Sequence, residues 1–176
     1  MGPHRRLTLL RHGQAHPAVD GDDRVRALTK RGVRQAEAVG RRLRALGWVP
    51  DLVVASPATR TAATAEIVAR ACGLGDRRVF RAEPLYGADP GTIWRVVADT
   101  APEVRHVLIC GHNPGLSELA SRLGPRPESR HLGTGALASA VWDRGGWDEI
   151  DPGDAVRCDR EEPEDHAAGP ACRAHD

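Results

Sequence analysis

The chain has 176 residues, of which 40% are hydrophobic, and this is enough for one ordinary domain with a packed core. Charged residues make up 28% but the net charge is only +1, which gives no reason to expect nucleic-acid binding. No apolar run approaches the length of a membrane span or of a secretory signal. No CxxC pair occurs, so we expect free thiols and a cytoplasmic protein; the cysteines are Cys72, Cys110, Cys158 and Cys172.

The apolar pattern predicts short strands that alternate with helices. In chain order the predicted elements are a strand at 7–10, a helix from Thr29 to Gly47, a strand at 51–56, a helix from Ser56 to Gly73, a helix from Asp89, a strand at 106–110, a helix after residue 115 and a strand at 136–142. Thr29, Ser56 and Asp89 are predicted N-caps because their side chains can accept a hydrogen bond from a free backbone N–H.

The chain divides into a domain at residues 1–150 and a tail at residues 151–176. The tail holds eight acidic side chains and three arginines, with almost no bulky apolar residues. Such a segment buries too little apolar surface to offset its loss of conformational entropy. We therefore predict a disordered tail.

Alternation of strands and helices predicts an α/β fold, a three-layer α/β/α sandwich with a mainly parallel central sheet. In such sheets ligands bind at the carboxyl ends of the strands. The residues that directly follow each strand are therefore the candidates for chemistry.

Three predicted strand ends each supply a cation or an imidazole. Arg11, His12 and Gly13 follow the first strand, Arg60 lies just after the second, and His112 follows the strand at 106–110. Two arginines and two histidines in one crevice suit a dianionic group, most naturally phosphate, because guanidinium forks bind its oxygens in pairs. Helix N-termini nearby add backbone N–H donors.

Each of these residues also has a plain structural interpretation. Arg-His-Gly alone could be a solvated turn, Arg60 a surface residue, and His112 a hydrogen-bonding histidine of its turn. A metal site is the other alternative, with ligands from His12, His16, His112, Asp20, Asp22 and Asp23. Two arginines beside a cation would be unfavourable, and no helical HxxxH or cysteine pair occurs, so we predict no metal and no cofactor.

Together the segments LLRHGQAHP, SPATRTAATA and GHNPGLSELA resemble the three signatures of the histidine phosphatase superfamily, also called phosphoglycerate-mutase-like. LTKRGVRQA at 28–36 is similar to a further segment of that family, so the resemblance spans about residues 6 to 142. The chain leaves little room for the insertions that cap the site in mutases and acid phosphatases. With HNPG and TGALAS it looks most like the compact SixA branch, the phosphohistidine phosphatases.

The resemblance implies a metal-free mechanism with His12 as nucleophile and a covalent phosphohistidine intermediate. Arg11 and Arg60 would hold the phosphoryl oxygens, and His112 would donate a hydrogen bond to the same group. The other ring nitrogen of His12 would be tied to a backbone carbonyl in the loop after Gly13, with Gly13 allowing the backbone to approach closely.

The general acid departs from the family pattern. Gly87 stands where mutases carry a glutamate, and Glu83 and Asp89 are the flanking candidates, although Asp89 also suits a helix cap and Glu83 a surface charge. An alkyl phosphate loses a poor alkoxide leaving group that needs a proton, whereas the leaving nitrogen of a phosphoramidate protonates readily, so a missing acid favours phosphohistidine. The expected substrate is thus a phosphorylated protein. The alternatives are a small phosphate ester, or a non-catalytic module that binds phosphate.

Overall fold

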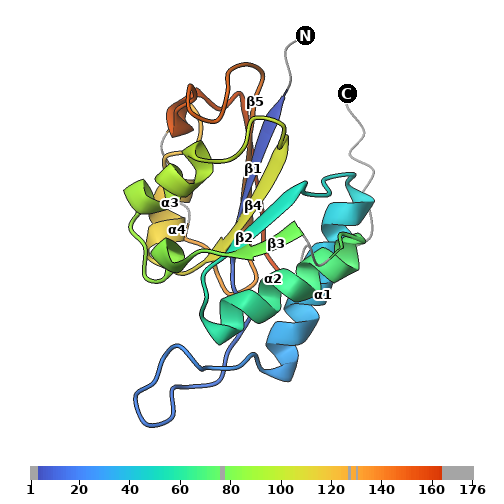
Figure 1. Ribbon diagram of the computed structural model, residues 1–176, viewed down its shortest axis with the longest axis vertical. Helices are drawn as coiled ribbons and strands as arrows, with labels where there is room; N and C mark the ends of the chain where they lie inside the picture. Colours follow the sequence, from blue (N-terminus) through green and yellow to red (C-terminus); the bar gives the residue numbers. More distant parts are fainter. Residues whose placement is uncertain (1–3, 76–77, 127, 130, 164–176) are drawn as a thin grey trace.

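The computed structural model describes residues 4–75, 78–126, 128–129 and 131–163. Its centre is a six-stranded sheet with the order β3-β2-β4-β1-β5-β6 (Figure 1). The strands are β1 (Arg5–Arg11), β2 (Leu52–Ala55), β3 (Val79–Arg81), β4 (His106–Gly111), β5 (Leu137–Trp142) and β6 (Arg157–Glu161). β1 to β4 pair in parallel, whereas β5 is antiparallel to both β1 and β6. The predicted mainly parallel α/β sheet is confirmed as a mixed sheet with two antiparallel pairings.

Helices cover both faces of this sheet and complete three layers (Figure 1). They are α1 (Lys30–Ala45), α2 (Thr59–Cys72), α3 (Pro90–Ala98) and α4 (Gly115–Ala120). Two apolar clusters form the core, one shared by the sheet with α1 and α2 and one shared with α3 and α4. Leu10 belongs to the first cluster and Leu9 to the second, because successive strand residues face opposite sides. Within the described part of the chain, no helix is long and apolar enough to cross a membrane.

Two of the three predicted helix starts are confirmed. The Thr29 side chain accepts from the backbone N–H of Gly32 before α1, and Asp89 accepts from Thr92 before α3. The third prediction is wrong, because α2 begins at Thr59 and Ser56 does not cap it. The hydroxyl of Ser56 instead lies 2.7 Å from His112 Nε2, at the candidate site.

The predicted disorder from residue 151 is wrong for residues 151–163. Residues 157–161 form β6, which pairs along β5 from Val141 to Leu137. Ala155 is buried, and Glu161 forms an ion pair with Arg42 of α1 at 3.0 Å. Backbone pairing and this ion pair hold a strand that is too polar to be predicted from apolar residues. The rest of the tail, residues 164–176, lies outside the described residues.

Candidate active site

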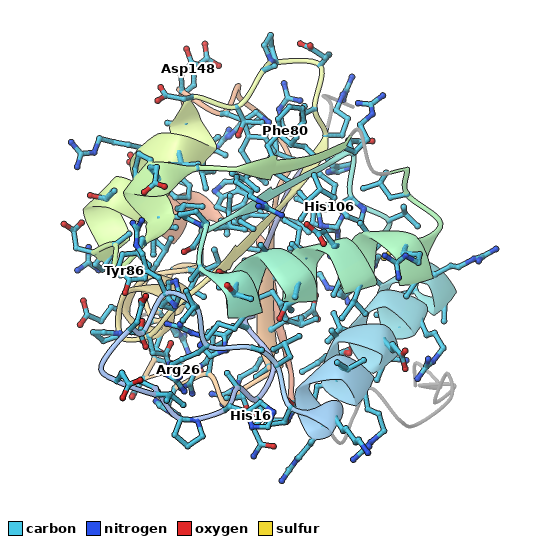
Figure 2. The ribbon with its side chains drawn as sticks, turned by 60° about the horizontal axis from the view of Figure 1, so that its bottom comes forward. His16, Arg26, Phe80, Tyr86, His106 and Asp148 are labelled. Carbon is cyan, nitrogen blue, oxygen red and sulfur yellow. The ribbon has the colours of Figure 1, made fainter. Side chains whose placement is uncertain are left out.

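Four of the five residues predicted from strand ends line one pocket of about 370 Å³, and the fifth, Gly13, which was also predicted to bind substrate, does not line it. Its full lining is Arg11, His12, Asp23, Arg26, Arg60, Tyr86, Gly87, His112 and Asn113. Figure 2 shows two of these, Tyr86 and Arg26, on the same side of the molecule. His12, Arg60 and His112 are at most 8% exposed. They therefore form the floor of the pocket at the carboxyl edge of the parallel strands.

His12 directly follows β1, and its two ring nitrogens have different partners. Nδ1 lies 2.7 Å from the carbonyl oxygen of Gly13, which can only accept, so Nδ1 carries the proton. Nε2 therefore keeps a lone pair, and it accepts from Arg60 Nε at 3.3 Å. Burial chiefly, together with the nearby charge of Arg60, lowers the pKa of His12 to about 4. The imidazole is thus neutral at physiological pH.

Gly13 has a structural role that the sequence did not indicate. A Cβ at this position would lie 2.5 Å from the carbonyl oxygen of Gly32 in α1, so no side chain fits between β1 and that helix. Its backbone N–H donates to Thr64 Oγ1 of α2 at 3.1 Å. Gly13 thus packs the turn against two helices while its carbonyl fixes His12.

His112 follows β4 and is neutral in the opposite tautomer. Arg60 Nη2 can only donate, so His112 Nδ1, 3.1 Å away, must accept. His112 Nε2–H then donates to the fully buried Ser56 Oγ at 2.7 Å. Burial, with Arg60 as the next cause, lowers the pKa of His112 to about 4. The pocket thus holds two uncharged imidazoles whose ring centroids are 5.5 Å apart.

Arg11, at the end of β1, lines the pocket together with Arg26 and Arg60. Its Nη1 donates to the carbonyl oxygen of Leu132 at 3.0 Å. Asn113 Nδ2 donates to the same oxygen at 2.8 Å, so one carbonyl orients two pocket side chains. Arg11 Nε is buried and has no hydrogen-bond partner among the described residues. A buried donor without an acceptor is costly.

Neither predicted acid candidate lines the pocket. Asp89 is bound to the backbone N–H of Thr92 at the start of α3, the structural role that the sequence also offered. Glu83 lies on the surface and forms an ion pair with Arg24 at 2.9 Å. Among the described residues, the one carboxylate that lines the pocket is Asp23, which from the sequence was a candidate only as a metal ligand.

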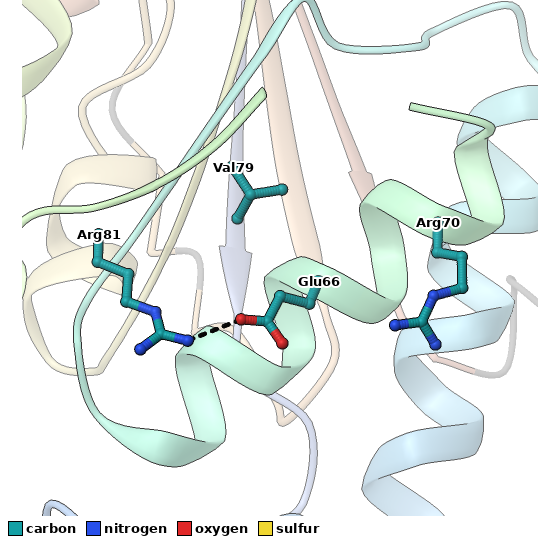
Figure 3. A pocket seen from close by; sticks show the side chains of 4 residues that line it. All are labelled: Glu66, Arg70, Val79 and Arg81. Atoms are coloured by element: carbon teal, nitrogen blue, oxygen red, sulfur yellow. Dashed lines mark hydrogen bonds and ion pairs between the residues drawn. The ribbon is translucent and has the colours of Figure 1, made fainter. Parts of the chain in front are cut away.

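In the part of the chain that the structure describes, no three His, Cys, Asp or Glu side chains are grouped as metal ligands would be. His16 and Asp20 do not line the pocket. A second pocket, between α2 and β3, is lined by Glu66, Arg70, Val79 and Arg81 (Figure 3). An ion pair of 2.8 Å joins Glu66 to Arg81 there, and the pocket contains none of the predicted site residues.

One family model and several known proteins resemble this chain. The family model described as "Histidine phosphatase superfamily (branch 1)" matches residues 7–82, which include His12 and Arg60. A structure of a candidate SixA phosphohistidine phosphatase from Nakamurella multipartitia is 30% identical and superposes with a TM-score of 0.73, covering 86% of this chain and 92% of that one. The chain belongs to the histidine phosphatase superfamily. Its similarity to SixA structures places it in the SixA-type branch.

Other relatives of this superfamily member are similar over shorter stretches. A candidate SixA from Agrobacterium tumefaciens is 26% identical, with a TM-score of 0.69 and coverage of 84% of this chain and 98% of that one. An uncharacterized chloroplastic protein from Arabidopsis thaliana is 33% identical over 130 residues, which is 68% of this chain. The chain spans 59% of the length of that plant protein.

Several residues of this candidate site were not predicted as phosphate-site residues from the sequence. Asp23 and Arg26 come from the loop between β1 and α1, Tyr86 follows a short helical turn, and Ser56 directly follows β2. The SPATR segment was a signal for Ser56, but its pattern equally suits an N-cap. The loop residues carry no periodic pattern that could have placed them beside Arg60.

Proposed function

We propose that this protein is a metal-independent phosphatase that acts on protein phosphohistidine through a covalent intermediate on His12. The observation that carries the proposal is the state of the His12 ring. Its Nδ1–H is held by the Gly13 carbonyl at 2.7 Å, and this leaves the Nε2 lone pair facing the pocket beside Arg60. A neutral imidazole with a fixed tautomer is ready to act as a nucleophile.

In the first step the Nε2 lone pair attacks phosphorus, a P–Nε2 bond forms, and the bond from phosphorus to the leaving nitrogen breaks. In the second step water attacks phosphorus, the P–Nε2 bond breaks, and the water proton passes to solvent. Inorganic phosphate leaves and His12 regains its lone pair. Arg11 and Arg60 stabilise the negative charge on the phosphoryl oxygens, an effect commonly worth about 3–4 kcal/mol for one preorganised donor.

His112 contributes through a proton that it must first acquire. Its Nδ1 accepts from Arg60 Nη2, so it can donate to a phosphoryl oxygen only as an imidazolium. A bound dianion favours that form, because a nearby opposite charge raises the pKa of a histidine. Ser56 holds the opposite nitrogen and keeps the ring aligned.

The carboxylate in the pocket supports this choice of substrate. Hydrogen bonds from Arg26, Arg60 and Tyr86 hold the pKa of Asp23 well below its usual range, so it has no proton to give to a leaving group. A leaving alkoxide needs such a proton, whereas the imidazole of phosphohistidine is protonated readily by solvent. The pocket is therefore better suited to phosphohistidine than to a sugar phosphate.

The test is hydrolysis in EDTA of a phosphohistidine-carrying protein and of p-nitrophenyl phosphate. Wild type is compared with His12→Ala, and with His16→Ala as a matched histidine outside the pocket. We expect turnover and an acid-labile phosphoenzyme in wild type and His16→Ala, and neither in His12→Ala. Preference for p-nitrophenyl phosphate would point instead to a small ester as substrate. Phosphate binding without turnover of either compound would indicate a non-catalytic module.

A further inference from the structure

Asp23 contacts Arg60 through both its backbone and its side chain. Arg60 Nη1 donates to the Asp23 carbonyl oxygen at 2.6 Å, and Arg60 Nη2 donates to Asp23 Oδ2 at 2.8 Å. These two bonds occupy the outer edge of the guanidinium, where the two terminal nitrogens lie side by side. The outer edge of Arg60 is therefore already bound by the loop between β1 and α1.

The inner edge of the same guanidinium faces the two imidazoles. Arg60 Nε donates to His12 Nε2 at 3.3 Å, and the other N–H of Nη2 donates to His112 Nδ1 at 3.1 Å. A guanidinium is planar and its N–H bonds have fixed directions, so an anchored outer edge determines where the inner edge points. A phosphoryl group between His12 and His112 would meet a fork of two donors.

Asp23 is itself held from two sides. Arg26 Nη1 donates to Oδ1 at 3.0 Å, and the Tyr86 hydroxyl donates to Oδ2 at 2.9 Å. Arg26 belongs to the same loop, but Tyr86 comes from the segment before α3, so the carboxylate links two parts of the chain. Three donors that surround one carboxylate give it a defined place in the pocket wall.

We propose that Asp23 is a positioning residue that anchors the outer edge of Arg60, so that the inner edge is aimed at the phosphoryl group on its way to His12. The inference rests on the proposed function for the identity of the bound group. Asp23 does not touch the reacting atoms and acts through Arg60. The opposite effect, in which the Asp23 charge repels a phosphoryl dianion, predicts tighter anion binding when the carboxylate is removed.

The test compares Asp23→Asn with Asp23→Ala, because both variants remove the charge but only asparagine keeps an oxygen that can accept from Arg60 Nη2 and Tyr86. Asp20→Asn makes the same chemical change elsewhere in the loop and is the matched control. Two quantities are measured: the dissociation constant of inorganic phosphate, and the NMR signal of the Arg60 Nε–H group, assigned with Arg60→Lys. Melting temperatures confirm that each variant is folded.

We expect Asp23→Asn to bind phosphate at least about tenfold more tightly than Asp23→Ala, since a small displacement of a catalytic group is costly. The Arg60 Nε–H signal should stay near its wild-type position in Asp23→Asn and Asp20→Asn, and shift or broaden in Asp23→Ala. Equal phosphate affinity in the two Asp23 variants, or an unchanged Arg60 signal in Asp23→Ala, would overturn the proposal. Absence of phosphate binding by wild type would overturn the proposed function instead, and the Arg60 signal would still decide the role of Asp23.

Discussion

His12 should become protonated at Nε2 only at a pH far below the pKa of a free histidine. Burial of the ring, with further contributions from Arg60, His112 and Arg11, lowers its pKa from 6.5 to about 4. At about 1.4 kcal/mol for each pKa unit, this shift corresponds to about 3 kcal/mol between the charged and neutral forms. The neutral nucleophile should therefore persist from pH 7 down to about pH 5, and kcat/KM should not fall near pH 6.5 on account of His12.

The same shift has a consequence for stability, with a defined sign. The pKa of His12 is lower in the folded protein than in the unfolded chain, so the unfolded chain binds the proton more tightly. Stability is therefore lost as the pH falls from about 6.5 to about 4, and the loss from His12 amounts to about 3 kcal/mol. Below that range both states are protonated and the loss does not grow. His112 contributes with the same sign, since its pKa is also lowered to about 4.

Two measurements check this reasoning. The first is the pH titration of the His12 Cε1–H signal by NMR, assigned with His12→Asn, for which we expect a midpoint near 4. The second is the free energy of unfolding in urea at pH 7 and pH 4.5, which should fall by a smaller amount in His12→Asn than in wild type. A midpoint near 6.5, or an equal loss of stability in both proteins, would refute the argument from burial.

Three substitutions test other parts of the site and fold. Ser56→Ala leaves the buried Nε2–H of His112 without its acceptor at 2.7 Å, so urea unfolding should show a loss of about 1–3 kcal/mol and kcat should fall more than KM rises. Gly13→Ala places a Cβ 2.5 Å from the Gly32 carbonyl oxygen and should lower Tm, whereas Gly75→Ala, which meets nothing within 4 Å, should not; equal Tm values would contradict the packing argument. Asp89→Ala removes the α3 cap and should cost about 1 kcal/mol with activity unchanged, so a selective loss of turnover would mean that Asp89 reaches the substrate.

The parts of the site that follow directly from strand ends could be predicted from the sequence. Arg11 ends β1, His12 follows it, and His112 follows β4, a strand that pairs in parallel with β1. Short apolar runs are enough to identify such strands, and parallel pairing brings their carboxyl ends together. The position of these residues therefore depends only on local patterns and one topological rule.

The position of Asp23 could not be predicted in this way. It lies in an irregular loop and meets Arg60 across 37 residues of sequence, so the contact depends on the path of the loop and not on any periodic pattern. Three acidic residues occur close together in this loop, and nothing local shows which of them turns inward. Strand β6 could not be predicted for a related reason. It is held in the sheet by pairing with β5 and not by apolar residues of its own.

The ionised state of Asp23 links the orientation of Arg60 to the choice of leaving group. As a carboxylate, Asp23 accepts from Arg26, Arg60 and Tyr86 at the same time. A protonated Asp23 could serve as a general acid, but its hydroxyl would then need an acceptor and the carboxyl would lose accepting capacity toward these three donors. The arrangement that would aim Arg60 at a phosphoryl group would thus exclude Asp23 from acid catalysis. A site built in this way is suited to substrates whose leaving group does not depend on the enzyme for its proton.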